Sequence, residues 1–288
     1  MRTVTIVLVG AVALYLSAIA YVMAFQRSFV FDVRDSGGTL DAAGTIAIPG
    51  SQRIAIPTSD GETLAGWYLP PRQPDAPVFL FMHGKSGGLE RKVGRWSRLA
   101  DRGAGVLAFS YRGYPGSTGE PSEAGLYEDA RAAYRWLAGR HESGRIVLHG
   151  LSLGTGVASR LATEVDAKAV VLEAPFAALV DVAAARQPWL PVHLLLIDRF
   201  ESLPLMAKLR MPLLIVHGTR DTAIPISHAE RLYAAAKEPK RLVAIPGGDH
   251  STLPRDGLYD HVFAFLGDLD RSRTLSEATP PVEAPAQP

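Results

Sequence analysis

Cysteine is absent from this chain of 288 residues, so neither disulfide bonds nor thiolate metal ligands can stabilise its fold. An excess of one charge is also lacking, because 30 Lys and Arg residues face 29 Asp and Glu residues, for a formal net charge of +1. We expect no nucleic-acid partner, since phosphate binding requires concentrated positive charge and no basic stripe stands out. No H-E-x-x-H or comparable ligand spacing occurs, so the sequence implies no metal and no cofactor.

One long segment near the start lacks charged residues altogether. The run from Thr3 to Phe25 would span roughly 35 Å as a helix, which is enough to cross a bilayer. We therefore expect residues 1–27 to form a single-pass membrane anchor. A cleaved secretory signal is the alternative, because residues 18–20 read A-I-A, but the apolar run continues beyond them. The early Arg2 on a short leader favours a catalytic domain outside the cytoplasm.

The rest of the sequence predicts one large α/β domain. We assign residues 28–52 to a connector, 53–272 to the domain and 273–288, rich in Pro, Ala and Glu, to a disordered tail. Helical stretches such as 122–139 lie between strand-like runs at 53–57, 63–70, 77–82, 105–110, 145–149, 169–174, 212–217 and 241–245. This alternation predicts a mostly parallel sheet with helices on both faces and a site at the carboxyl ends of its strands. Residues 176–211 are expected to form a small lid.

Ser152 is the strongest candidate for a catalytic residue. It occupies the centre of Gly150-Leu151-Ser152-Leu153-Gly154, which has the G-x-S-x-G form of a nucleophile elbow between a strand and a helix. A short apolar run precedes this motif, and a stretch with helical character follows it at once. These flanks predict a sharp turn that exposes the serine hydroxyl.

A second match to the same pattern is centred on Ser86. It lies in the sequence HGKSGG after an apolar run, but no helical stretch begins directly behind it. The form HG-x-x-G is typical of an oxyanion loop after the third strand. We therefore favour Ser152 as the nucleophile and expect the backbone N–H groups of Lys85 and Leu153 to be the oxyanion donors.

A serine nucleophile requires a histidine base and a carboxylate that holds the histidine. Asp221 follows the strand-like run 212–217 and is the preferred acid. Glu173, at the end of an earlier strand-like run, and Asp249 are competitors. His250 follows a strand-like run and a glycine-rich loop, and it completes the order Ser, Asp, His. The sequence thus predicts a Ser152, Asp221, His250 triad.

Several longer segments resemble one family of proteins. The run at 110–137, the HGKSGG loop, HGTRDTAIP at 217–225 and PGGDH at 246–250 resemble the alpha/beta hydrolase superfamily. Within it, the chain looks like the membrane-anchored alpha/beta hydrolase domain-containing serine hydrolases, over roughly residues 54–269. Two positions depart from the family pattern, since Lys85 stands where a small polar residue is common and Ser110 where aspartate is common.

The resemblance implies the alpha/beta hydrolase fold, with an eight-stranded type of sheet, and hydrolysis of a carboxylic ester or thioester. Lipid esters or acylated proteins are the implied substrates. Lys85 could favour anionic substrates, or it could be a solvated loop cation. Two other functions stay open at this stage: an acyltransferase that uses the same triad, and a non-catalytic membrane-tethered binding module.

Overall fold

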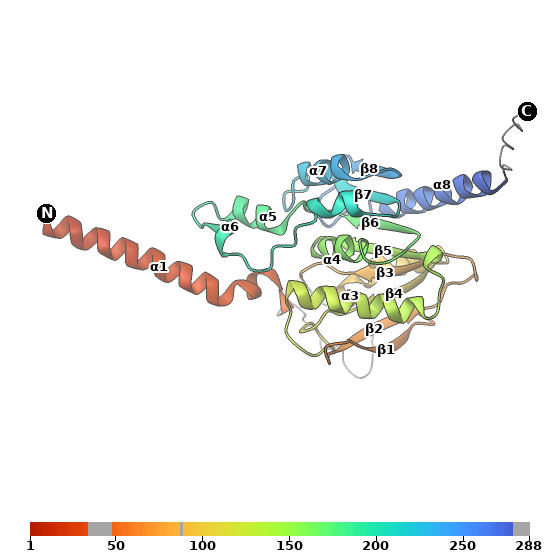
Figure 1. Cartoon of the computed structure of the whole chain (residues 1–288), viewed down its shortest axis with the longest axis horizontal. Helices are drawn as coiled ribbons and strands as arrows, with labels where there is room; N and C mark the ends of the chain where they lie inside the picture. Colours follow the sequence, from red (N-terminus) through yellow and green to blue (C-terminus); the bar gives the residue numbers. More distant parts are fainter. Residues whose placement is uncertain (34–47, 87–88, 279–288) are drawn as a thin grey trace, which may run out of the picture.

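The computed structural model describes residues 1–33, 48–86 and 89–278 of the chain (Figure 1). A long helix, α1 (Arg2–Val30), extends away from an α/β body that holds the remaining described elements. By length and composition α1 can cross a membrane, with a mean hydropathy of 2.4 in its most apolar window. A helix of this kind near the N-terminus fits both an anchor and a signal sequence.

The body is built on one eight-stranded sheet with the order β1-β2-β4-β3-β5-β6-β7-β8. The strands are β1 (Gln52–Pro57), β2 (Thr63–Leu69), β3 (Val78–Met82), β4 (Gly105–Phe109), β5 (Ile146–Leu151), β6 (Ala169–Glu173), β7 (Leu213–Gly218) and β8 (Lys240–Ile245). β2 pairs antiparallel with both β1 and β4, and every other pairing is parallel. The predicted α/β fold with a mostly parallel sheet is therefore confirmed.

The helices of the body are α2 (Val93–Asp101), α3 (Glu123–Ala138), α4 (Leu153–Leu161), α5 (Leu179–Arg186), α6 (Val192–Leu195), α7 (Ser227–Ala235) and α8 (Leu258–Ala278). Short 3-10 turns occur at Leu89–Lys92, Ser143–Arg145 and Leu203–Lys208. Parallel strands bring all their carboxyl ends to one edge of the sheet, so the loops after β3, β5, β7 and β8 meet there.

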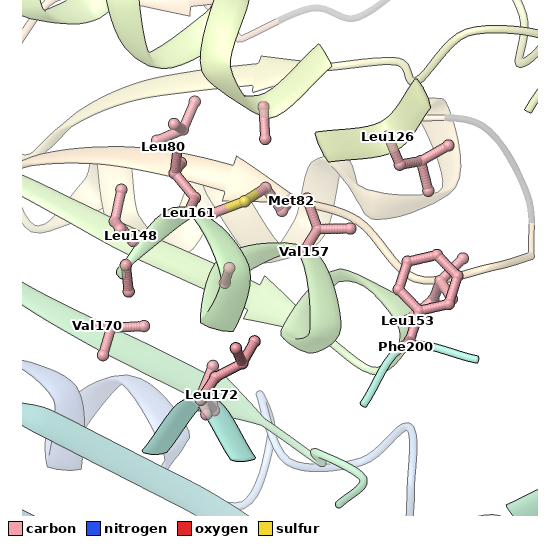
Figure 2. Close-up of a cluster of buried hydrophobic side chains, with 14 of the residues drawn as sticks. Leu80, Met82, Leu126, Leu148, Leu153, Val157, Leu161, Val170, Leu172 and Phe200 are labelled. Atoms are coloured by element: carbon pink, nitrogen blue, oxygen red, sulfur yellow. The ribbon is translucent and has the colours of Figure 1, made fainter. Parts of the chain in front are cut away.

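Strand residues alternate between two separate apolar cores. Leu80 and Leu148 face the side that α3, α4 and α7 cover, where they pack with Val157 and Leu161 of α4 (Figure 2). The intervening Phe79, Val147 and their equivalents face the side of α2 and α8. Burial on both faces explains why the central strands read as continuous apolar runs in the sequence.

The ends of the chain differ from the sequence-based boundaries. α1 ends at Val30, three residues beyond the expected anchor, and Phe31 is buried in the core of the body. The expected connector falls largely on residues 34–47, which lie outside the described part. α8 continues to Ala278, six residues into the stretch expected to be a disordered tail, and residues 279–288 lie outside the described residues.

Within the expected lid at 176–211, the chain forms α5, α6 and the 3-10 turn at Leu203–Lys208. The part with α5 and α6 lies beside α1 (Figure 1). Leu190 and Val192 of this part are packed with Ile19 and Val22 of α1. This segment therefore forms one side of a contact with the N-terminal helix.

Candidate active site

The turn between β5 and α4 has the geometry of a nucleophile elbow. Ser152 adopts φ 49° and ψ −115°, a positive-φ conformation that a non-glycine residue rarely takes. The backbone packs so closely here that a Cβ on Gly150 would collide with the carbonyl of Gly154, and a Cβ on Gly154 would collide with that of Met82. The G-x-S-x-G pattern therefore reflects close packing of main chain on both sides of the serine.

Ser152, His250 and Asp221 come together in a hydrogen-bonded chain, although they are far apart in the sequence. The Nε2 atom of His250 lies 2.9 Å from Ser152 Oγ, and its Nδ1 atom lies 2.7 Å from Asp221 Oδ2. Because an ionised carboxylate only accepts hydrogen bonds, Nδ1 must carry a proton. Nε2 of the neutral ring is then an acceptor for the Ser152 hydroxyl.

Asp221 is held as a carboxylate by several donors. Its Oδ1 accepts hydrogen bonds from the backbone N–H groups of Ala223 and Ile224, both at 2.8 Å. Burial by itself would raise the pKa of Asp221, but hydrogen bonds from His217, His250 and Ile224 outweigh burial and hold this pKa below its ordinary value. The group is thus ionised and oriented at neutral pH.

The two competing acids have other partners. The buried carboxylate of Glu173 forms an ion pair with Arg95 and contacts His149 Nε2 at 3.3 Å. Asp249 Oδ1 accepts from the backbone N–H groups of Ser251 and Thr252, and so it stabilises its own turn. Of the three acids that the sequence offers, Asp221 is the one bonded to His250.

The loop after β3 lies directly beside the serine. A Cβ on Gly84 would be 3.4 Å from Ser152 Cβ, so the backbone of this loop passes along the nucleophile. His83 Nδ1 is 2.7 Å from the Gly84 carbonyl oxygen, and Tyr114 Oη donates to the Lys85 carbonyl at 2.8 Å. In a trans peptide the N–H points away from the C=O, so His83 also fixes the direction of the Lys85 N–H.

The remaining sequence candidates also lie at this site. Lys85, Leu153 and Ser86 line the same cavity as Ser152. The Lys85 ammonium donates to the carbonyl of Phe29 in α1 at 2.9 Å, and Ser86 forms an isolated backbone bridge with Asp32. The Lys85 side chain, although exposed, therefore binds the N-terminal helix, which neither sequence interpretation of this residue anticipated.

A cavity of about 850 Å³ opens at Ser152 and His250. Its walls are mainly apolar side chains from α1, α5 and the segment around α6. Four cationic residues, Lys85, Lys92, Arg95 and Arg186, and no Asp or Glu line it among the residues that the structure describes. Such a site suits an apolar ligand with a polar or anionic end.

Sequence reasoning missed the contributions of Gln26, Tyr114, Glu173 and Arg95. A glutamate at the end of a buried strand requires a partner, so Glu173 could have prompted a search for a cation. Gln26 is a lone amide near the end of an apolar helix and is only 5% exposed. Its polarity was the one available signal that this part of α1 contacts protein.

Comparisons with known proteins place the chain in one family. The model of the alpha/beta hydrolase family matches residues 79–207. An uncharacterised protein of Mycobacterium tuberculosis is 38% identical over 247 residues, which cover 84% of this chain and 87% of that protein. The lysophosphatidylserine lipase ABHD12 of Danio rerio is 32% identical over 199 residues, covering 62% of this chain and 52% of the lipase.

Among solved structures, an esterase from Pyrococcus furiosus has the same fold, with a TM-score of 0.64 and 22% identity over 77% of this chain and 90% of the esterase. The chain belongs to the alpha/beta hydrolase family and resembles its ABHD members. It is a hydrolase, and the resemblance inferred from its motifs is confirmed. The chain spans about half the length of the zebrafish lipase.

Proposed function

We propose that this hydrolase is a serine esterase that cleaves the carboxylic ester bond of a lipid through an acyl-enzyme on Ser152. The observation that carries the proposal is the hydrogen-bonded chain from Ser152 Oγ through His250 to Asp221. A buried carboxylate, a histidine and a strained serine in this order are the parts that acyl transfer to a hydroxyl requires.

In the proposed mechanism, Ser152 Oγ attacks the ester carbonyl while His250 Nε2 takes its proton. Asp221 stabilises the resulting imidazolium, and the backbone N–H groups of Lys85 and Leu153 donate to the oxyanion. His250 then protonates the leaving alcohol. Water, activated by the same histidine, attacks the acyl-enzyme and releases the acid.

A lipid substrate is supported by the apolar walls of the cavity and by the candidate membrane helix that lines it. The zebrafish relative is a lipase of lysophosphatidylserine, a lysophospholipid with an anionic headgroup. Apart from Arg95, which is paired with Glu173, the cationic residues at the cavity support a lipid of the same kind here. A thioester or an acylated protein could react by the same chemistry.

We further propose that α1 is an uncleaved anchor and that the catalytic domain lies outside the cytoplasm. Arg2 precedes the apolar run, and an arginine on that side supports this orientation. Protease added to sealed spheroplasts or outside-out vesicles should digest the domain. Protection of the domain until the membrane is permeabilised would place it on the cytoplasmic side.

The function is tested with the full-length protein in phospholipid nanodiscs, assayed on p-nitrophenyl esters of graded length and on lysophospholipids. Ser152→Ala should abolish turnover, while Ser86→Ala should leave most of it. Loss of activity only in Ser86→Ala would identify the other serine as the nucleophile. An inactive parent that an alkyl fluorophosphonate does not label would instead support a binding module.

The acyltransferase alternative uses the same triad with an alcohol in place of water. Product analysis in the presence of glycerol and of short alcohols separates the two reactions. A hydrolase should release mainly free fatty acid at every alcohol concentration. A transferase would form the new ester in preference to the acid.

A further inference from the structure

The C-terminal end of α1 is bound to the catalytic domain by several side-chain contacts. Arg27 Nε lies 3.1 Å from the buried Asp198 carboxylate, whose other oxygen accepts the backbone N–H of Glu123 at the start of α3. Gln26 Oε1 accepts the N–H of Ile197 at 2.8 Å. Phe31 packs edge-on against Phe200, with 6.2 Å between ring centroids. The last turns of this helix are therefore fixed relative to the triad.

The same helix forms a wall of the cavity at Ser152. Ala18, Tyr21, Val22 and Phe29 line the cavity from α1. Side chains of α5 and of the segment around α6, including Leu179, Val182, Leu190 and Leu196, line it as well. A substrate bound at the serine would thus contact residues that by sequence belong to the membrane segment.

The cavity follows the helix axis away from the serine. Its catalytic end lies near Phe29, because the Phe29 carbonyl binds Lys85 on the loop beside Ser152. Ala18 is eleven residues earlier, which corresponds to about 16 Å along a helix. Near that end, Tyr15 Oη donates to the Trp189 carbonyl at 3.1 Å, so the segment between α5 and α6 still contacts α1 there. We call the part of the cavity between Phe29 and Ala18 the acyl slot. A slot of this length accommodates an extended acyl chain.

The outer surface beside this slot is apolar as well. Trp189, Leu194 and Ile197 are 53%, 85% and 59% exposed, in a part of the chain that packs against α1. On α1 itself, Tyr21 and Phe25 are more than half exposed. This surface continues directly into the apolar helix that can span a bilayer. Its exposed apolar side chains are therefore suited to contact with lipid.

We propose that the acyl chain of the substrate lies along α1, between this helix and the α5–α6 segment, and reaches Ser152 sideways from the bilayer. Ala18 and Val22 are then specificity-determining residues that set the acyl length, although the sequence places them in a membrane anchor. This inference rests on the proposed esterase function. It assigns to α1 a role in substrate selection in addition to anchoring.

The test is a substitution that fills the far end of the slot in the full-length protein in nanodiscs. Ala18→Trp adds a large side chain where the cavity wall has a methyl group. Overpacking of this kind should lower kcat/KM for p-nitrophenyl palmitate by about tenfold or more. The value for p-nitrophenyl acetate should stay close to that of the parent, because its short chain does not reach Ala18.

Val12→Trp is the matched control, since Val12 lies on the same helix, is 57% exposed and does not line the cavity. It should retain the parent activity on both esters. Equal activity of Ala18→Trp and the parent on palmitate, or an equal loss on both esters, would overturn the proposal. A parent inactive on every ester would instead defeat the esterase function, so the two failures are distinguishable.

Discussion

At the scale of single residues, the candidate acids of the site differ in their bonding partners. Three carboxylates were candidates for the triad acid, and each of them has a defined set of partners in the structure. Glu173 is neutralised by Arg95, Asp249 stabilises a turn, and Asp221 is bonded to His250. Sequence position alone could not choose among them with certainty, because each lies close to a strand end or to the histidine.

Replacing Asp221 should therefore lower kcat much more than replacing Asp249. Asp221→Asn keeps the shape of the side chain but removes the charge that stabilises the imidazolium, so kcat should fall by about 10³–10⁴. Asp249→Asn is the matched control and should change kcat only slightly. A larger loss in the Asp249 variant than in the Asp221 variant would contradict the assignment.

His83 links the site to the pH dependence of stability. Burial lowers the pKa of this histidine to about 4, although the bond to the Gly84 carbonyl opposes the shift. The unfolded chain binds a proton here below about pH 6.5, but the folded chain does not until about pH 4. Stability from the neutral ring is thus complete above pH 6.5 and is lost as the pH falls toward 4.

A His83→Gln variant removes this contribution. Its apparent melting temperature should depend less on pH between 6.5 and 4 than that of the parent. A part of the slope should remain, because burial lowers the pKa of His149 to about 3 in the same direction. Thermal denaturation of both proteins in detergent at several pH values measures the difference. Identical slopes would show that His83 is not kept neutral by the fold.

At the scale of elements, the strands were predictable to within about two residues. Central strands are buried on both faces and are bounded by glycine, proline or polar residues, so their apolar runs have sharp ends. The elbow was predictable for a related reason, since two glycines mark the close approach of backbones. The extension of α8 to Ala278 was not, because its last residues lack an apolar pattern.

The elbow glycines give a prediction about stability. A methyl group on Gly154 would collide with the main-chain carbonyl of Met82, which cannot move without shifting β3. Gly154→Ala should therefore cost about 2–3 kcal/mol of unfolding free energy. Gly94→Ala is the matched control, because nothing lies within 4 Å of its added Cβ in α2, and it should stabilise by about 0.5–1 kcal/mol. Equal effects in thermal denaturation would contradict this packing.

At the scale of the whole molecule, the least predictable feature is the contact between α1 and the catalytic domain. The segment from Thr3 to Phe25 is apolar on all sides, so its sequence contains no amphipathic pattern that identifies a protein-facing side. The helix could be predicted from length and composition. Its place as a wall of the cavity could not, because it depends on how the segment around α5 and α6 folds against it. Removal of residues 1–27 would also remove Gln26 and Arg27, which bind the domain.

This arrangement predicts that the N-terminal helix is retained. Cleavage after the A-I-A sequence at 18–20 would remove one end of the cavity wall and leave Tyr21 at the new terminus. The intact mass of the protein purified from membranes should therefore include residues 1–20. A mass equal to that of a chain beginning at Tyr21 would identify the segment as a signal peptide.

The central claim is that Ser152 carries the acyl group during turnover. The most direct test is to label the full-length protein with an alkyl fluorophosphonate and to map the adduct by peptide mass spectrometry. We predict one adduct on the peptide that contains Ser152. It should be absent from Ser152→Ala, and excess long-chain ester present during labelling should slow its formation. An adduct on Ser86, or ester turnover that survives in Ser152→Ala, would contradict the account.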